Sequence, residues 1–318
     1  MELNQVFEYR GWAIKYALLD PIREPGLQSN DFKTAVFVHG TPWSSVTFWP
    51  IAGTLLANGS HRVLLYDLPG YGNSQSYKSI ESHVKEKDQT HFEGDTSVRF
   101  QAEAFSELLQ HLKFGGKNGN RAPEVIAHDI AGAIALRAHL IHGSLFSSLL
   151  LMDTNTVLPW GDGFYKLVRS EPKVFLQLPD GIYEAMLRAV IRSATFNSDK
   201  LKADWEELLA KPWLTGIESA PERQEQAQKS FVRQIAQAND EDVAEMLDKS
   251  MYSQVSCPVK MLWGEHDQWI PRQKMESLAS MLGDALKEFV VIPNAGHLIM
   301  VDQPERVAIE VFSWLSER

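Results

Sequence analysis

The sequence predicts an α/β fold with a mostly parallel central sheet flanked by helices. Short apolar runs bounded by turn residues alternate with helical stretches, which is the pattern of repeated βαβ units. From residue 154 to residue 258 no convincing strand appears, so this part is expected to be a helical insertion. The length of 318 residues and the hydrophobic content of 44% are sufficient for a full core.

The expected sheet begins with a hairpin over residues 6–20 that turns at Arg10-Gly11, and it continues with six strands. These strands are expected at residues 35–38, 62–66, 124–127, 147–152, 259–263 and 288–292. Residues 100–112 have apolar side chains at helical spacing and should form the helix before the strand at 124.

Composition limits the classes of partner. The formal net charge of -10 opposes binding to nucleic acid or to an anionic membrane, because the field of the protein would repel phosphates. A small-molecule substrate is more compatible with this charge. The only cysteine, Cys257, cannot form an internal disulfide and is interpreted as a buried spectator.

The sequence shows no recognisable signal for targeting or for a cofactor. The N-terminal segment has no apolar block typical of a signal peptide, and no stretch approaches the ~20 apolar residues of a membrane span. We therefore expect a cytoplasmic protein. The histidines show no metal-ligand spacing, so neither a metal nor another cofactor is expected. The sequence does not predict the oligomeric state.

The strongest local motif runs from Val125 to Gly132. A β-branched run meets small residues where a strand must turn sharply into a helix, with Ala127 and Ala131 on either side of Asp129. Such a turn lifts a nucleophile above a sheet, and its common form is G-x-S-x-G. An aspartate at a strand end can also simply cap the next helix. The companion motifs favour Asp129 as the nucleophile.

One companion motif is the H-G-x-P turn in residues 36–42, which ends an expected strand. This turn directs a backbone N–H toward the nucleophile, where it pairs with the N–H of the following residue. The expected oxyanion hole therefore consists of the Thr41 and Ile130 N–H groups.

Two further motifs supply an acid and a base. Residues 261–267 place Asp267 just beyond a strand, and residues 291–297 place His297 just beyond the next strand. Nucleophile, acid and base then follow one another in an order known for triads on parallel sheets. We expect His297 to be the base and Asp267 to orient it.

With these motifs the chain resembles the α/β-hydrolase superfamily over nearly its whole length. His128-Asp129 is similar to the branch that contains epoxide hydrolases and haloalkane or haloacetate dehalogenases. The resemblance implies an α/β-hydrolase core at residues 1–157 and 254–318, with a helical cap at 158–253. It also implies Asp153 as an alternative acid, because some dehalogenases place the acid after this strand.

A carboxylate nucleophile favours particular chemistry. Its attack on an ester carbonyl would give a mixed anhydride, whereas attack on an sp3 carbon gives a simple alkyl ester. His297 would then activate a water that hydrolyses the ester, with the oxyanion hole holding the developing charge.

The leaving group distinguishes the possible substrates. Dehalogenases with this elbow resemble one another in placing Trp or Arg after the nucleophile, whereas Ile130 stands here. Epoxide hydrolases resemble one another in supplying hydroxyl donors from cap tyrosines, which makes Tyr183 and Tyr252 candidate donors. The candidate indole donors to a halide are Trp43, Trp160, Trp213 and Trp269. The other expected pocket residues are His39, His128 and Tyr165, although the two histidines are expected chiefly to organise the backbone.

The first hypothesis is an epoxide hydrolase acting on a modest, largely apolar epoxide. The second is a dehalogenase with the same covalent mechanism. A third is a hydrolase-fold enzyme diverted to another biosynthetic reaction, and a fourth is a ligand-binding protein without catalysis. The complete set of nucleophile, acid and base argues against the fourth.

Overall fold

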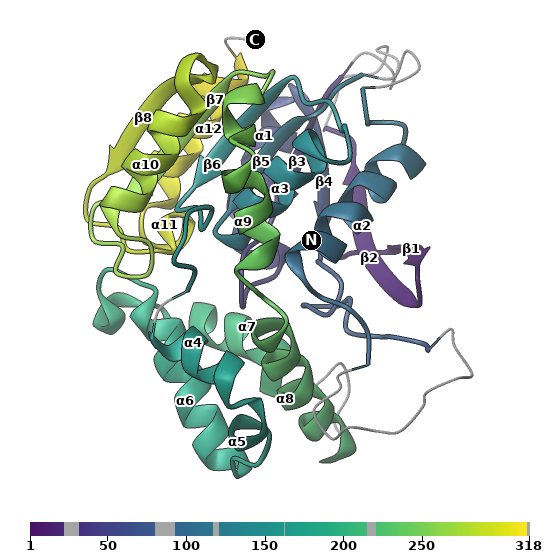
Figure 1. The fold of residues 1–318 in the computed structure, drawn as a ribbon, viewed down its shortest axis with the longest axis vertical. Helices are drawn as coiled ribbons and strands as arrows, with labels where there is room; N and C mark the ends of the chain where they lie inside the picture. Colours follow the sequence, from purple (N-terminus) through teal and green to yellow (C-terminus); the bar gives the residue numbers. More distant parts are fainter. Residues whose placement is uncertain (22–31, 80–92, 117–120, 162, 215–220, 317–318) are drawn as a thin grey trace.

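The structure is a computed structural model that describes residues 1–21, 32–79, 93–116, 121–161, 163–214 and 221–316. Its centre is an eight-stranded sheet with the order β1-β2-β4-β3-β5-β6-β7-β8 (Figure 1). The antiparallel part consists of β1 (Gln5–Tyr9), β2 (Trp12–Leu19) and the pairing of β2 with β4 (His61–Tyr66). All the other pairings are parallel. The remaining strands are β3 (Lys33–Val38), β5 (Glu124–His128), β6 (Ser148–Met152), β7 (Val259–Gly264) and β8 (Leu286–Ile292).

The central strands are apolar because they are buried, whereas the edge strand is not. Every residue of β5, β6 and β7 is buried, as expected for central parallel strands covered on both faces. The edge strand β1 has no buried residue. The sheet predicted from the short apolar runs is confirmed, including the N-terminal hairpin.

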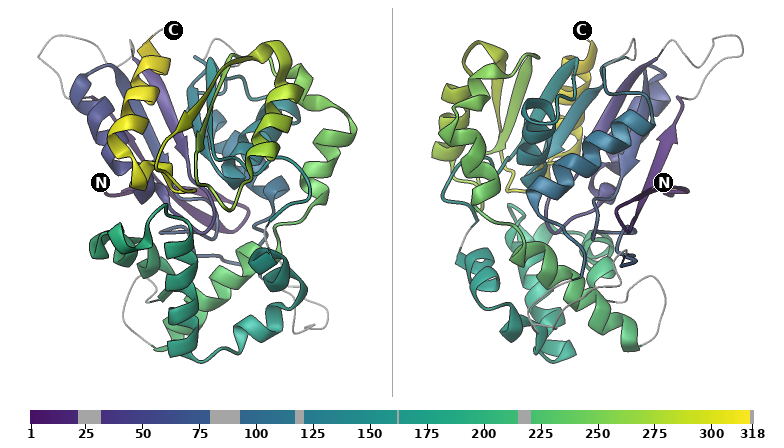
Figure 2. Two further views of the ribbon diagram at one scale, coloured as in Figure 1. Left: turned by 90° about the vertical axis from the view of Figure 1, so that its left-hand side faces the viewer. Right: turned by 45° about the vertical axis from the view of Figure 1, so that its right-hand side comes forward.

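Helices cover both faces of the sheet (Figures 1 and 2). On one face α1 (Trp49–Asn58) packs against α12 (Pro304–Ser316). The other face is covered by α2 (Val98–His111), α3 (Ile130–Leu140) and α10 (Arg272–Leu282). The predicted helix at 100–112 corresponds to α2, which begins two residues earlier because Ser97 Oγ accepts a hydrogen bond from the Phe100 N–H at 3.3 Å.

Five helices gather at one end of the sheet and form what we call the cap (Figures 1 and 2). They are α4 (Gly163–Ser170), α5 (Pro172–Leu176), α6 (Asp180–Ser193), α7 (Ala203–Leu214) and α8 (Pro221–Ala236). The next helix, α9 (Glu241–Asp248), lies within the expected cap range but packs on the core. Arg137 of α3 donates to Asp242 O at 2.9 Å and pairs with Glu245 at 2.6 Å.

The topology brings distant parts of the chain to one edge. The carboxyl ends of parallel strands all meet at the same edge of the sheet, which is where ligands bind in open α/β sheets. The segments after β3, β5, β6, β7 and β8 therefore converge there, and the cap lies over them (Figure 1). The short helix α11 (Ile299–Asp302) follows the last of these segments.

Candidate active site

Asp129 occupies a strained turn between β5 and α3. Its backbone angles are φ 56° and ψ −125°, a region that non-glycine residues rarely adopt. The turn is stabilised by hydrogen bonds to the Asp129 carbonyl oxygen from the N–H groups of Gly132 at 3.0 Å and Asn155 at 3.1 Å. The side chain is 8% exposed, so the carboxyl group is held nearly out of solvent.

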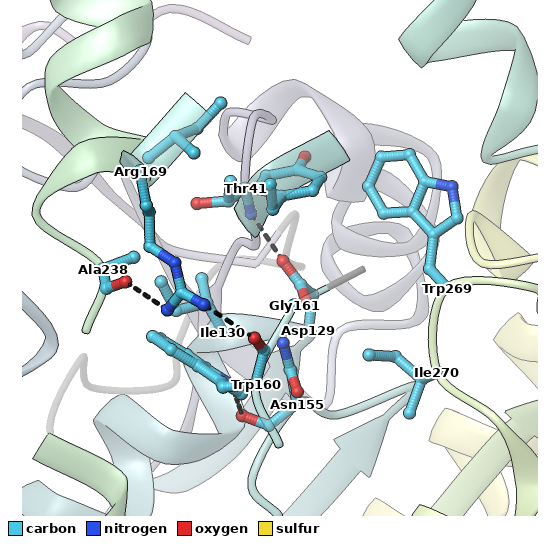
Figure 3. A pocket seen from close by; sticks show the side chains of 12 residues that line it. Thr41, Asp129, Ile130, Asn155, Trp160, Gly161, Arg169, Ala238, Trp269 and Ile270 are labelled. Carbon is cyan, nitrogen blue, oxygen red and sulfur yellow. Dashed lines mark hydrogen bonds between the residues drawn. The ribbon is translucent and has the colours of Figure 1, made fainter. Parts of the chain in front are cut away.

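Backbone donors surround the Asp129 carboxylate. The Thr41 N–H donates to Asp129 Oδ2 at 2.8 Å (Figure 3). The Ile130 N–H also hydrogen-bonds to the carboxylate. Burial raises the pKa of Asp129 above its ordinary value, while His297 and the two N–H groups oppose that rise. The two donors expected from the motifs therefore both hold the side chain of Asp129.

Gly132 allows α3 to approach the segment after β6. A Cβ at residue 132 would lie 2.5 Å from Thr154 Cβ, far inside van der Waals contact. We expect Gly132→Ala to lower the free energy of unfolding by about 1–3 kcal/mol, since the overpacked site must shift. Chemical denaturation measures this change.

Gly181 provides the matched control for this substitution. It lies in the first turn of α6, and nothing would contact an added Cβ within 4 Å. Gly181→Ala should leave stability unchanged or raise it by up to about 1 kcal/mol, through helix propensity alone. Equal effects at the two positions would contradict the steric argument.

His297 lies between the carboxylates of Asp267 and Asp129. Its Nδ1 lies 3.0 Å from Asp267 Oδ2, and its Nε2 lies 3.8 Å from Asp129 Oδ1. A carboxylate only accepts hydrogen bonds, so the ring donates Nδ1–H to Asp267. The Nε2 lone pair is then directed toward the nucleophile.

Asp267 accepts hydrogen bonds on both of its carboxylate oxygens. Its Oδ1 accepts hydrogen bonds from the N–H groups of Trp269 at 2.8 Å and Ile270 at 3.0 Å, and its Oδ2 accepts from His297. Three donors on one buried carboxylate satisfy most of its hydrogen-bonding capacity. This pattern suits the orienting acid of a triad.

Asp153 lies beside Asp267 and has a different environment. It is fully buried, and its Oδ1 accepts a hydrogen bond from the Gly264 N–H at 2.8 Å. Its side chain is also in hydrogen-bonding contact with Asp267. Burial and the adjacent Asp267 charge raise the pKa of Asp153 well above its ordinary value. Burial and the neighbouring carboxylate therefore favour the protonated form of Asp153.

The two histidines of the motifs support the backbone. His128 Nε2 lies 2.8 Å from the His297 carbonyl oxygen, and burial lowers the pKa of His128 well below its ordinary value. His39 contacts Gly40 O through Nδ1 at 2.9 Å and accepts from the Leu68 N–H through Nε2. Carbonyl oxygens only accept, so both rings are donors there. Neither histidine lines the pocket.

A pocket opens above Asp129 and encloses about 470 Å³ of space, part of it open to solvent. Its apolar wall is formed by Ile130, Trp160, Ile235, Ala238, Trp269 and Ile270. Polar groups besides Asp129 are few, namely Thr41, Asn155, Tyr165 and Arg169 (Figure 3). A largely apolar pocket with a few polar groups suits a small organic ligand.

The two expected tyrosine donors lie elsewhere. The Tyr183 hydroxyl donates to Trp213 O at 3.2 Å, and the Tyr252 hydroxyl donates to Thr156 O at 2.8 Å. Both side chains are buried, and neither lines the pocket. Their placement argues against the expected role, because each hydroxyl proton is directed at a main-chain carbonyl. Of the expected tyrosines, Tyr165 of α4 lines the pocket.

The indole N–H groups of three candidate tryptophans also donate to oxygen atoms of the protein. The indole N–H groups of Trp160, Trp213 and Trp269 donate to Asn155 O, Pro42 O and Ser193 Oγ respectively. Trp43 is buried and stacks on Trp269 with ring centroids 5.8 Å apart, and it does not line the pocket. Trp269 also stacks on His297 at 4.8 Å and so helps to fix the base.

Sequence reasoning missed Asn155 and Arg169. Asn155 follows β6 without a recognisable motif, and Arg169 is one of many charged residues in the cap. The Arg169 guanidinium donates to Ala238 O at 2.8 Å and to Trp160 O at 2.9 Å (Figure 3). It also donates to Asp240 Oδ1 at 2.9 Å. It thereby joins the two ends of the cap beside the pocket.

Two further features concern the residues that the structure describes. These residues include no group of three or more His, Cys, Asp or Glu side chains placed to hold a metal ion. None of the helices in this part of the chain is long and apolar enough to cross a membrane.

The parallel sheet, the strained turn and the acid–base pair at its carboxyl edge are the arrangement of hydrolases that act through a nucleophile at this edge. The model of the alpha/beta hydrolase family matches residues 35–311, and the chain belongs to this family. A search of curated proteins found no match.

Solved structures share the fold over nearly the whole chain. An alpha/beta hydrolase fold protein from Burkholderia ambifaria is 30% identical, with a TM-score of 0.79 and 98% of each chain covered. The epoxide hydrolase CorEH is 17% identical, with a TM-score of 0.71 and 98% of each chain covered. A thermophilic esterase from Thermogutta terrifontis is 19% identical, with a TM-score of 0.67 and coverage of 96% and 94%.

Proposed function

We propose that this hydrolase opens an epoxide through an alkyl ester on Asp129 and then hydrolyses that ester. One observation carries the proposal. A carboxylate stands at the turn where a hydroxyl nucleophile is usual, with Oδ2 held by backbone N–H groups and Oδ1 facing His297 at 3.8 Å. This geometry supports a mechanism in which the same side chain attacks a substrate and is then attacked by a water.

The chemistry of the nucleophile selects an sp3 carbon. In the first step Asp129 Oδ1 forms a bond to a ring carbon, the carbon–oxygen bond of the epoxide breaks, and its electron pair stays on the oxygen. That oxygen takes up one proton from solvent. The product of this step is a hydroxyalkyl ester of Asp129.

The second step regenerates the enzyme. His297 Nε2 takes a proton from a water whose oxygen attacks the Asp129 carboxyl carbon, and the Thr41 and Ile130 N–H groups hold the oxyanion. The alkyl oxygen departs as the second hydroxyl of a diol and takes the proton from His297. Ionisation of Asp129 returns the proton consumed in the first step, so the net reaction is epoxide plus water to diol.

The pocket favours a small apolar substrate and an oxygen leaving group over a halide. Its wall is mostly aliphatic and aromatic. The two indoles that line it, those of Trp160 and Trp269, already donate within the protein, and Ile130 follows the nucleophile. Halide release by the same carboxylate is the second outcome that the test must distinguish.

The test is covalent trapping with His297→Gln. Without the base the ester should persist, because attack by Asp129 does not require His297 but hydrolysis does. The variant is incubated with panels of terminal and aryl epoxides and of haloalkanes and haloacetate, and intact and peptide masses are then measured. We expect the peptide that contains Asp129 to gain the full mass of an epoxide.

The other outcomes are equally specific. A gain of the alkyl group with release of halide would establish a dehalogenase instead. Absence of any adduct from both panels would overturn an alkylating function. The double variant His297→Gln/Asp129→Asn is the control, since it retains the fold but lacks the attacking carboxylate.

A further inference from the structure

The leaving oxygen of an opened epoxide needs a hydrogen-bond donor in the pocket, and most donors there are already used. The Thr41 N–H donates to Asp129, and its hydroxyl lies 2.6 Å from the Tyr71 hydroxyl. The indole N–H groups of Trp160 and Trp269 donate to protein oxygens. Three donations from Arg169 are made to protein oxygens.

Asn155 differs from these residues. Its backbone is fixed on both sides, because its N–H donates to Asp129 O at 3.1 Å and its carbonyl accepts from the Trp160 indole at 2.7 Å. Its side chain lines the pocket and is 9% exposed, and the amide oxygen is buried without a hydrogen-bond partner in the described part of the chain. Figure 3 shows the amide nitrogen on the side toward Asp129.

The buried amide oxygen can only accept a hydrogen bond, so the donor of this side chain is its NH₂ group, which lies on the side toward Asp129. The rigid backbone of Asn155 holds this amide next to the nucleophile in an otherwise apolar pocket. An N–H group fixed in such a place stabilises negative charge without having to reorganise when the charge appears.

We propose that the Asn155 amide donates to the oxygen that leaves when Asp129 attacks, and that it selects substrates whose leaving atom is a strong hydrogen-bond acceptor. The inference rests on the proposed alkyl-ester mechanism. It assigns Asn155 to the first half-reaction alone, since the Thr41 and Ile130 N–H groups serve the oxyanion of the second.

The test separates the two half-reactions. Formation of the Asp129 ester is followed by rapid quench and intact mass in His297→Gln and in His297→Gln/Asn155→Leu, where leucine is similar in size to asparagine but has no donor. We expect ester formation from an epoxide to slow by about 10²- to 10³-fold, the effect of removing one such donor. The loss should be smaller for an iodoalkane, since iodide is a weak acceptor.

Hydrolysis of the ester provides a second measurement with His297 present. In Asn155→Leu alone, single-turnover hydrolysis should keep the rate of the parent enzyme. Slowing of both half-reactions to the same extent would indicate general damage to the site and would overturn the assignment.

Thr156→Val is the matched control. Thr156 is in the same segment and fully buried, with a hydroxyl that has no hydrogen-bond partner in the described residues, but it does not line the pocket. Its rate of ester formation should equal that of the parent. Unchanged ester formation in the Asn155→Leu variant would overturn the role of Asn155 and leave the proposed function standing. Absence of any ester in His297→Gln itself would overturn the proposed function, and the role of Asn155 with it.

Discussion

Replacement of Asp267 by asparagine is expected to lower kcat by about 10³- to 10⁴-fold, the scale seen when the acid of a triad loses its charge. The reason lies in the donors around this side chain. The Trp269 and Ile270 N–H groups would retain the amide oxygen at the position of Oδ1, so the NH₂ group would face His297 Nδ1. Two donors cannot hydrogen-bond, and the ring must place its proton on Nε2, where it blocks the base.

Asp153→Asn is the matched comparison, and it should retain most of the activity. The amide oxygen can accept from the Gly264 N–H as Oδ1 does, and the NH₂ group can donate to Asp267 as the protonated acid does. Asn also tolerates the φ of 44° at this position. The two acids left open by the sequence would thus be separated by one pair of variants.

Steady-state turnover of the substrate that gives the adduct in the His297→Gln experiment measures both effects. Trapping adds a second readout, because the Asp267→Asn variant should accumulate the ester while the Asp153→Asn variant should not. A larger loss in Asp153→Asn than in Asp267→Asn would reverse the assignment of the acid.

The fold and the positions of Asp129, Asp267 and His297 were accessible to sequence reasoning for a physical reason. Parallel strands need short buried apolar runs, and loops at their carboxyl ends meet at one edge, so residues just after the strands could be assigned to one site. The α/β-hydrolase fold is confirmed by the sheet and by the family match. The roles of these three side chains remain predictions.

The acid could not be chosen from the sequence because β6 and β7 are neighbours in the sheet. Asp153 follows β6 and Asp267 follows β7, so both carboxyl groups reach the same place. Only the surrounding N–H groups distinguish them, and these come from the loop geometry after each strand.

The side chains of the cap were the hardest part of the site to predict from the sequence. Tyr183 and Tyr252 are at plausible positions along the chain, but the direction of a hydroxyl depends on the rotation of its helix against its neighbours. Asn155 was not predicted because a single amide after a strand forms no recognisable sequence motif. Its place in the pocket depends on how the chain turns after β6, which the sequence pattern does not reveal.

Asp129→Asn is expected to abolish turnover and, at neutral pH, to stabilise the fold. Loss of activity follows because an amide cannot displace the leaving group as a carboxylate does. Stability should increase because burial raises the pKa of Asp129, which means that the native state holds the charged form less favourably than the unfolded chain does. Asparagine also accepts the positive φ of 56° and can keep the hydrogen bond from the Thr41 N–H.

Because the native pKa of Asp129 is raised, the stability gained by Asp129→Asn should depend on pH. A carboxyl group whose native pKa is raised contributes no penalty below its unfolded pKa, which is about 3.9 for aspartate. The penalty grows by about 1.4 kcal/mol per pH unit above that value and stops growing once pH exceeds the native pKa. The stability gain of Asp129→Asn should therefore be small near pH 4 and reach a plateau above the native pKa.

Urea unfolding of the wild type and the Asp129→Asn variant between pH 4 and pH 8 measures this dependence. Asp248→Asn is the control, because Asp248 is exposed at the end of α9 and its substitution should shift stability little at any pH. A gain for Asp129→Asn that is constant with pH would come from packing rather than from charge. A loss at neutral pH would mean that the N–H groups and His297 more than offset the cost of burying the carboxylate, and the nucleophile would then stabilise the fold it is placed in.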